Sequence, residues 1–335
     1  MASRIPSSPP VIQPLKGLDK PPRWSVMIPA YNCSVYLHDA LRSVLEQNIS
    51  EDDMQIEVVD DASTDANVEE IVQKIGKGRV KYFRQAKNVG SLRNFETCIN
   101  RSKGEIIHLL HGDDRVKPGY YSKMDYLFKL YPESAAAFCR YSYIDEKGLH
   151  KFNRDVEMDK DGILQDWLLR IAKVCSVQYV SIAIKRHVYE KLGSYYGLIY
   201  GEDWEMWVRM AQFYQVAYTP EILAEYREHS SSITGIKFLN GEILKDTGHV
   251  FKLIENYLPE RERESTIREA RKQSAQYGLH IANLVWEKTR NMKYVNANIK
   301  QVMNMYYDFA ICRQIVKLYL NIIKSTVAVK SINHN

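Results

Sequence analysis

The sequence predicts an α/β fold, with a mostly parallel sheet covered by helices on both faces, followed by a helical C-terminal region. Two observations predict it. Between residues 24 and 145, short apolar runs alternate with segments whose apolar residues recur every three or four positions. Beyond residue 235 only the helical spacing remains. Such alternation is typical of parallel sheets, because parallel strands need a crossover that is usually a helix.

The expected elements follow one another in this order from residue 24 onward. Ser34 and Asp65 are the expected N-caps of the first two helices, because their side chains can accept from free backbone N–H groups. The expected strands are 24–28, 55–61, 79–85, 104–114 and 135–145, and the expected helices between them are 34–48, 65–75, 90–102 and 118–132. Further along, we expect a helix at 162–173, a strand, turn and helix at 177–195, a helix at 200–215 and an extended segment at 216–234.

Composition excludes several classes of protein. No window approaches the ~18 apolar residues of a membrane span, and the proline-rich segment 1–22 has no apolar core of a signal peptide. We expect that segment to be a disordered lead-in. The five cysteines form no CxxC pair, which favours reduced thiols and a cytoplasmic protein. The absence of GxGxxG and GxxxxGK[ST] argues against dehydrogenases and P-loop enzymes.

Positive charge is concentrated near the C-terminus. Residues 271–330 hold ten Lys or Arg and two acids, a net charge of +8, whereas the whole chain carries +5. A basic region of this kind could meet phosphate-rich lipid, a lipid-linked substrate or nucleic acid. No aromatic-basic RNA motif accompanies it, so we expect no nucleic-acid partner.

Pairs of acids end two of the expected strands. Asp113 and Asp114 follow an apolar run, and such neighbours either bind a divalent cation that neutralises them or form a solvated turn. Asp61 could accept hydrogen bonds from a nucleotide base or ribose, or serve in an Asx turn. Tyr31 could stack on a flat ring or be an ordinary loop residue.

Other candidate residues lie further along the chain. Glu202 and Asp203 begin a helix, where an acid could be a general base or simply complement the helix dipole. His229, in a serine-rich loop, could contact a metal or phosphate or be a structural hydrogen-bonding residue. Arg93 could meet a pyrophosphate or be a surface charge.

Six motifs occur in one order: SVMIPAYN, VVDDASTD, NVGSLRN, GEIIHLLHGDD, GEDWEMWVRM and YREHSSSIT. With them, residues 24–235 resemble a family 2 inverting glycosyltransferase of the GT-A fold. The resemblance implies a GT-A catalytic domain at 23–235, with a nucleotide-binding half at 23–115 and an acceptor half at 116–235. Residues 236–335 would then be a helical extension.

The resemblance also implies roles for individual residues. Tyr31 would stack on the base and Asp61 would bond its edge. Asp113 and Asp114 would contact the donor ribose and Mn²⁺ or Mg²⁺, and Asp203 would deprotonate the acceptor hydroxyl. The motif reads Asp-Asp where the family has Asp-x-Asp, so it stays open which carboxylate takes the metal. Four further residues complete the set, with Pro29, Arg93 and Glu202 on the nucleotide-sugar and His229 on the metal or diphosphate.

The implied activity is metal-dependent transfer of a sugar, with inversion, from a nucleoside-diphosphate donor to a glycan or lipid-linked glycan hydroxyl. UDP is favoured over GDP or dTDP, and surface polysaccharide assembly is the implied setting. The alternatives are a sugar-nucleotide nucleotidyltransferase, disfavoured because IPAYNCS is neither glycine-rich nor basic, and a catalytically inactive GT-A module that acts as a scaffold or glycan binder.

The segment 311–330 predicts a basic amphipathic helix. Arg313, Lys317 and Lys324 lie opposite an apolar stripe. Three interpretations stay open, namely attachment to the inner face of an anionic membrane, packing against the catalytic domain, and formation of a homodimer.

Overall fold

The computed structural model describes residues 3–17 and 20–332, with side chains described as far as residue 325. The chain divides into two compact units. The first, here called the sheet unit, comprises Met1–Leu168 and Ser176–His229. The second, here called the helical unit, comprises Leu169–Cys175 and Ser230–Asn335.

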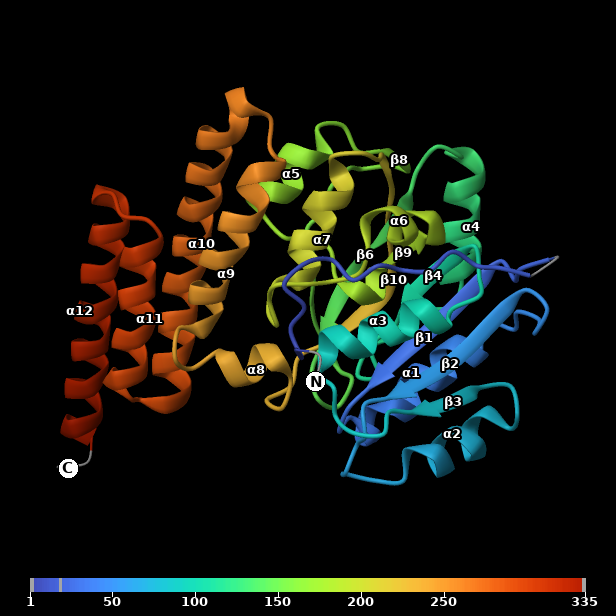
Figure 1. Ribbon diagram of the computed structural model, residues 1–335. Coiled ribbons are helices and arrows are strands. Elements are labelled where there is room, and N and C mark those ends of the chain that lie inside the picture. The colour runs from blue at the N-terminus through green and yellow to red at the C-terminus, as the bar shows by residue number, and fades with distance from the viewer. Residues whose placement is uncertain (1–2, 18–19, 333–335) are drawn as a thin grey trace. The chain divides into compact units, whose positions relative to one another are not determined.

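The sheet unit contains the strands and the helices that cover them (Figure 1). Its strands are β1 (Trp24–Ala30), β2 (Met54–Asp60), β3 (Lys81–Arg84), β4 (Ile106–Leu109), β5 (Arg115–Val116), β6 (Ala136–Ile144), β7 (His150–Asn153), β8 (Gly162–Ile163), β9 (Ile182–Lys185) and β10 (Val216–Arg227). Its helices are α1 (Ser34–Leu45), α2 (Val68–Gly76), α3 (Ser91–Arg101), α4 (Tyr120–Leu130), α6 (Arg186–Leu192) and α7 (Glu202–Ala211), with a 3-10 turn, η1, at Tyr179–Ser181.

The described strands form one ten-stranded sheet in the order β3-β2-β1-β4-β9-β6-β10-β5, with β7 beside β6 and β8 beside β10. Pairing is parallel along β3-β2-β1-β4 and between β6 and β10. This confirms the predicted α/β fold with a mostly parallel sheet. The strand expected within 177–195 is β9, but apolar periodicity does not reveal its antiparallel place between β4 and β6. The short strands β5, β7 and β8 were not expected either.

The main core lies on one face of the sheet. Trp24, Val26 and Ile28 alternate along β1 toward this face, where they pack with residues of α1 and α4. The opposite face near the start of β1 receives α3. Gly104 allows close approach there, because a Cβ at this position would lie 2.4 Å from the carbonyl carbon of Trp24.

The structure places the N-caps of the first two helices at other residues than the sequence predicts. The N-cap of α1 is Cys33, and the carboxylate of Asp65 accepts from the backbone N–H of Ser34 at 2.9 Å. The N-cap of α2 is Asn67, whose side chain accepts from the backbone N–H of Glu70 at 3.2 Å. Asp65 therefore caps the neighbouring helix rather than its own, a choice that depends on tertiary structure and not on local sequence.

The described part of the N-terminal segment, for which composition favours a disordered lead-in, follows the surface of the sheet unit without helix or strand. Ile12 is 1% exposed. The carbonyls of Pro6 and Pro10 accept backbone N–H groups from Gly197 and Ser194, both at 2.9 Å. Prolines exclude regular hydrogen bonding by their own nitrogens but leave these carbonyls free to accept.

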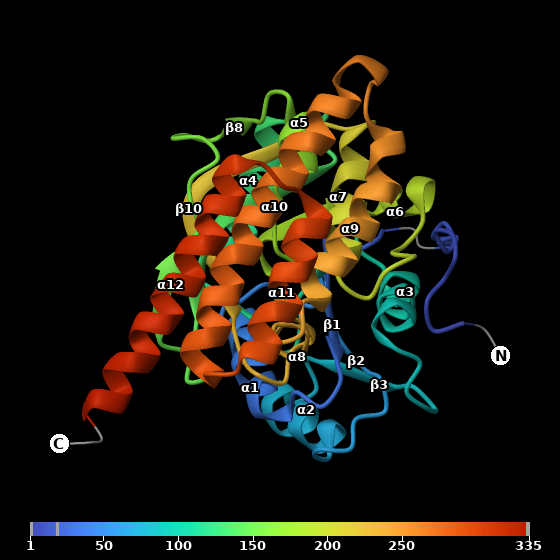
Figure 2. The same ribbon diagram turned by 90° about the vertical axis from the view of Figure 1, so that its left-hand side faces the viewer.

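The helical unit confirms the predicted helical C-terminal region. Helix α5 (Trp167–Lys173) begins in the sheet unit, and its residues from Leu169 onward belong to the helical unit. Figure 2 shows α10, α11 and α12 side by side. Within the described residues, no helix is both long and apolar enough to cross a membrane. The remaining elements are α8 (Ile233–Lys237), α9 (Glu242–Ile254), a 3-10 turn at Glu255–Tyr257, α10 (Glu260–Thr289), α11 (Met292–Met305) and α12 (Phe309–Ile332).

The predicted apolar stripe of α12 is largely packed inside the helical unit. Ile311, Leu318 and Ile322 are at most 7% exposed. Other apolar residues of the same helix, including Ile323 of the predicted stripe, are open to solvent. Each of them is more than half exposed: Phe309, Val316, Leu320 and Ile323.

Candidate active site

The carboxyl ends of β1, β2 and β4 meet at one edge of the sheet. Just beyond them, the backbone N–H of Asp61 donates to the carbonyl of Ala30 at 2.8 Å, and that of Gly112 donates to the carbonyl of Pro29 at 3.3 Å. The residue after β2 and the loop at 111–114 therefore both bond to the end of β1, which lies between β2 and β4. This is the edge at which parallel α/β sheets bind their ligands.

The acid that ends β2 is buried and forms its contacts within the fold. Asp60 is 0% exposed. Its carboxylate accepts from the backbone N–H of Ser63 at 2.9 Å and from the Tyr82 hydroxyl at 2.8 Å, and it forms an ion pair with Arg84. Asp60 thus fixes the ends of β2 and β3 to each other.

The second acid of this pair, Asp61, is held by a loop from the next crossover. Its carboxylate accepts from the backbone N–H groups of Val89 at 2.7 Å and Gly90 at 2.9 Å, and from the Asn88 side chain at 3.0 Å. Burial raises the pKa of Asp61, while the two backbone N–H groups oppose this rise. A carboxylate has about four acceptor positions, so one remains for a further donor.

The loop after β4 gathers three groups able to bind a metal. The ligand atoms of His111, Asp113 and Asp114 all lie within 4.8 Å of one another. Asp114 is 2% exposed, and its carboxylate accepts from the backbone N–H of Arg227 at 2.8 Å. This places the acid pair where the sequence predicts a cation site.

The two acids differ in their electrostatic surroundings. Burial and the neighbouring charge of Asp113 raise the pKa of Asp114 well above its usual range. Burial also opposes ionisation of Asp113, but the hydrogen bond from His229 and the charges of His111 and His229 lower the pKa of Asp113. Two carboxylates this close cannot both be ionised cheaply unless positive charge lies between them.

His111 is the site residue that our reading of the sequence missed. Its ring lies 4.3 Å from that of Tyr179 and 5.1 Å from that of Phe95, centroid to centroid. Its Nε2 is buried and has no hydrogen-bond partner among the described residues. An imidazole with an unused nitrogen beside two carboxylates fits a divalent cation. The signal was present in the sequence, because His111 precedes the acid pair by only two residues.

His229 lies beside the acid pair, outside the group of three. Its Nε2 is 2.9 Å from the carboxylate of Asp113, and its ring packs at 4.7 Å from that of Tyr36. The structure therefore gives His229 a contact with a candidate metal ligand. Its own contact with a metal or diphosphate stays a prediction.

Arg227 anchors the loop that carries the acids. Its guanidinium, 1% exposed, donates to the carbonyl of Asp113 at 2.8 Å and to the carboxylate of Asp39 at 2.7 Å. It also lies over the ring of Tyr36, 4.9 Å from the centroid. Because its backbone N–H reaches Asp114 as well, the end of β10 fixes both acids.

The predicted general base begins α7. Asp203 accepts from the backbone N–H of Trp204 at 2.7 Å, and burial raises the pKa of Asp203 to about 6. Its neighbour Glu202 accepts from the Tyr179 hydroxyl at 3.3 Å. The same tyrosine packs against His111, so one aromatic ring joins the start of α7 to the loop after β4.

The remaining predicted residues lie at the end of β1 and the start of α3. Pro29 is buried within β1, and Tyr31 just after that strand is 51% exposed, open to a stacking partner. Arg93, in the first turn of α3, donates to the carbonyl of Ser3 at 2.9 Å and to Glu96 at 2.7 Å. The structure therefore directs Arg93 toward the N-terminal segment.

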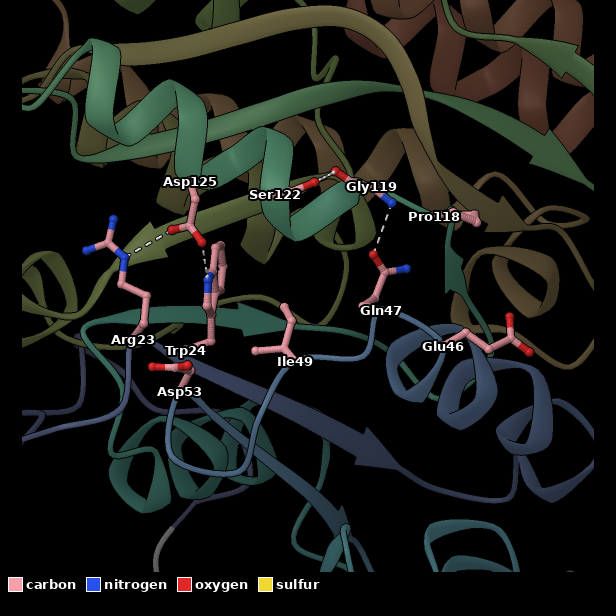
Figure 3. A pocket seen from close by; sticks show the side chains of 10 residues that line it. All are labelled: Arg23, Trp24, Glu46, Gln47, Ile49, Asp53, Pro118, Gly119, Ser122 and Asp125. Carbon is pink, nitrogen blue, oxygen red and sulfur yellow. Dashed lines mark hydrogen bonds and ion pairs between the residues drawn. The ribbon is translucent and has the colours of Figure 1, made fainter.

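A cavity of about 420 Å³ lies away from this edge, near the starts of β1 and β2 (Figure 3). Its polar groups bond one another. Asp125 accepts from Arg23 and from the Trp24 indole, both at 3.0 Å, and the backbone N–H of Gly119 donates to Gln47 at 3.1 Å. We assign no function to this cavity.

Comparison with known proteins identifies the family. Residues 25–193 match the family described as glycosyl transferase family 2, and the chain belongs to that family. An uncharacterized glycosyltransferase of Rickettsia typhi is 27% identical over 220 residues, which cover 64% of this chain and 66% of that protein. Chondroitin synthase of Escherichia coli is 34% identical over 103 residues, 30% of this chain and 14% of the relative. The chain thus spans less than two thirds of the length of the curated relatives it matches.

Solved structures show the same fold. The crystal structure of residues 1–349 of S. aureus TarS matches with a TM-score of 0.58 and 16% identity, covering 84% of this chain and 90% of that one. The structure of the same fragment in complex with UDP-GlcNAc matches with a TM-score of 0.55 and 14% identity, covering 85% and 93%. This agreement supports the GT-A fold that the sequence implied.

Proposed function

We propose that this protein is a metal-dependent inverting glycosyltransferase, which moves a sugar from a nucleoside-diphosphate donor to a hydroxyl of a glycan or lipid-linked glycan. The observation that carries the proposal is the group formed by His111, Asp113 and Asp114 at the ligand-binding edge of the sheet. A fixed cation site there suits a diphosphate leaving group. Membership of the family and the placement of Asp203 support the same reaction.

Donor binding is assigned to residues 23–115. The exposed ring of Tyr31 would stack on the base, and Asp61 would use its remaining acceptor position for a base N–H. UDP is the favoured nucleotide, since the S. aureus TarS fragment of the same fold binds UDP-GlcNAc. His111, Asp113 and Asp114 would hold the cation. When bound, the cation would offset the negative charge that develops on the departing diphosphate.

The composition of this group favours Mn²⁺ over Mg²⁺. Mg²⁺ prefers oxygen ligands in near-octahedral geometry, whereas an imidazole beside two carboxylates suits a softer divalent ion. The buried and unpartnered Nε2 of His111 is the atom that makes this distinction.

In the proposed reaction Asp203 acts as the general base. It takes the proton from the acceptor hydroxyl as that oxygen attacks the anomeric carbon of the donor, and the bond from this carbon to the diphosphate oxygen breaks on the opposite face. The nucleoside diphosphate leaves with the electron pair. Glu202, which accepts from the Tyr179 hydroxyl, would fix the start of α7 so that Asp203 faces the acceptor hydroxyl.

The test is calorimetric binding of UDP, GDP, dTDP and CMP, each with and without Mn²⁺. We expect one nucleotide, UDP, to bind in a metal-dependent manner and Asp114→Ala to abolish this binding. Asp52→Ala, which removes an exposed acid far from the loop after β4, is the matched control and should leave binding unchanged. If the folded wild-type protein binds none of the four, the inactive-scaffold alternative replaces this proposal.

We further propose that the helical unit meets an anionic membrane at the cytoplasmic face, near a lipid-linked acceptor of surface polysaccharide assembly. The exposed apolar residues Val316, Leu320 and Ile323 lie on the same helix as the exposed cations Arg313 and Lys317. An apolar strip flanked by positive charge is the pattern that binds such surfaces.

A further inference from the structure

The N-terminal segment reaches the edge of the sheet unit at which we propose that the donor binds, here called the donor edge. The guanidinium of Arg4 donates to the side-chain oxygen of Asn88. The carbonyl of Ser3 accepts from Arg93 at 2.9 Å. Arg4 also packs on Gly90, since a Cβ at that glycine would lie 3.1 Å from its Nε. Two residues of the segment thus hold two different parts of the donor edge.

The loop that Arg4 contacts is the one that holds Asp61. Asn88, Val89 and Gly90 supply all three of the hydrogen bonds described above for the Asp61 carboxylate. Arg4 lies on the other side of this loop and is close enough for its charge to favour ionised Asp61. The loop therefore contacts both Asp61, the proposed base-binding acid, and a cation supplied by the segment.

The same segment is anchored at its other end near α7. The backbone N–H of Ser194 donates to the carbonyl of Pro10, and the guanidinium of Arg209 on α7 donates to the carbonyl of Ser194 at 3.0 Å. Arg186 donates to the carbonyl of Gln13, also at 3.0 Å. Figure 1 shows the segment, in dark blue, passing beside α3. These contacts give the segment one defined path along the sheet unit.

Positive charge gathers where the segment passes α3. A cavity of about 690 Å³ lies between them, lined by the cations Arg4, Lys87, Arg93 and Arg101 and by one acid, Glu96. Arg93 is ion-paired with Glu96 and Arg101 with Glu57, which offsets much of this charge.

We propose that residues 3–13 contribute to the donor site. In this site Arg4 is a positioning residue that holds the loop Asn88–Gly90 against Asp61. Asp61 is thereby kept oriented toward the nucleotide base. The inference rests on the proposed function and adds to it a segment outside the residues that match the family, 25–193. Because Arg4 acts on the base end of the donor, its loss should affect recognition of the base and spare recognition of the diphosphate.

The experiment compares two probes, UDP and inorganic pyrophosphate, each titrated with Mn²⁺ into wild type, Arg4→Ala, Arg4→Lys and Lys16→Ala. We expect Arg4→Ala to weaken the affinity for UDP about tenfold, a loss typical of groups that orient a ligand-contacting residue. Pyrophosphate, which lacks a base, should bind as in wild type. Arg4→Lys should recover part of the UDP affinity, and Lys16→Ala, which removes an exposed charge of the same lead-in, should change neither probe.

Several results would overturn the inference. Unchanged UDP affinity in Arg4→Ala would remove Arg4 from the donor site, and tighter UDP binding would make the segment an obstacle to the donor. Equal loss of both probes would mean general damage to the fold or loss of charge attraction. If the wild-type protein binds pyrophosphate but not UDP, the proposed base-binding site is wrong. If it binds neither probe, the proposed function itself is wrong.

Discussion

The carboxyl of Asp203 combines two properties of a general base, a place at the first turn of a helix and a pKa matched to its task. Burial raises the pKa of Asp203 to about 6, above the usual value of an aspartate, while the N–H of Trp204 limits the rise. A base of this pKa is ionised at neutral pH yet accepts a proton readily. Trp204 and Trp207 of the same helix are buried.

The predicted consequence is a pH dependence of sugar transfer. Because only ionised Asp203 can accept a proton, the turnover number should fall about tenfold per pH unit below about 6 and level off above it. The measurement is a pH profile of transfer at saturating UDP-sugar. A profile that is flat from pH 5 to 8 would remove Asp203 from this role, as would an Asp203→Asn variant that still transfers sugar.

At the scale of single residues, sequence reading found the acids but not all their partners. Asp113 and Asp114 were visible because polar residues rarely end an apolar run without cause. His111 was not singled out, because a histidine beside apolar residues is as often structural, as its neighbour His108 shows. His108 is 0% exposed, burial lowers its pKa to about 3, and it lies 3.1 Å from the Tyr121 hydroxyl.

At the scale of elements, two glycines inside helices of the helical unit have different surroundings. Gly278 on α10 faces α9 and α11, and a Cβ there would lie 2.3 Å from Leu244 and 2.8 Å from Val302. Gly248 inside α9 has room, because its nearest neighbour would be Met305 at 3.8 Å. The close approach of α10 to its neighbours therefore requires glycine, while α9 does not require it.

These two positions form a matched pair of predictions. Gly248→Ala should stabilise the protein by about 1 kcal/mol, the usual gain from replacing glycine inside a helix. Gly278→Ala should destabilise it by about 1–3 kcal/mol, because the added methyl group overpacks the contact. Urea unfolding followed by circular dichroism measures both. Stabilisation by both variants would show that α10 can shift away from Leu244 and Val302.

Elements with strong apolar periodicity were predictable, but the pairing of the strands was not. The strand β1 and the helix α1 follow directly from their patterns. The strand β9, only four residues long, owes its place to antiparallel pairs with β4 and β6. Likewise, nothing in the local sequence near Arg227 shows that it reaches the acid loop more than a hundred residues earlier.

At the scale of the whole molecule, helix α12 of the helical unit presents a surface that combines exposed apolar and basic side chains. The sequence analysis left three interpretations of α12 open. The packing of Ile311, Leu318 and Ile322 accounts for one apolar stripe, and the residues Val316, Leu320 and Ile323 remain exposed. Membrane attachment and dimerisation make different predictions for these exposed residues.

We expect the triple variant Arg313→Glu, Lys317→Glu, Lys324→Glu to lose binding to anionic vesicles. Each cation near such a surface contributes about 1 kcal/mol, so the affinity should fall by roughly a hundredfold or more. Flotation with phosphatidylglycerol vesicles measures this, with phosphatidylcholine as the neutral comparison. The control reverses three exposed lysines of the sheet unit, Lys74, Lys81 and Lys129. Concentration-dependent self-association without vesicle binding would favour the homodimer instead.

The position of β9 has a consequence for how members of this family could diversify. In the described sheet, β9 alone joins β4 to β6, through two residue pairs on one side and three on the other. The strands before it in the sheet come from one uninterrupted stretch of chain, Trp24–Leu109, and those beyond it come from later residues. A single genetic crossover just before β5 would therefore exchange the proposed acceptor half while preserving the proposed nucleotide-binding half, so that new products could arise with an inherited donor site.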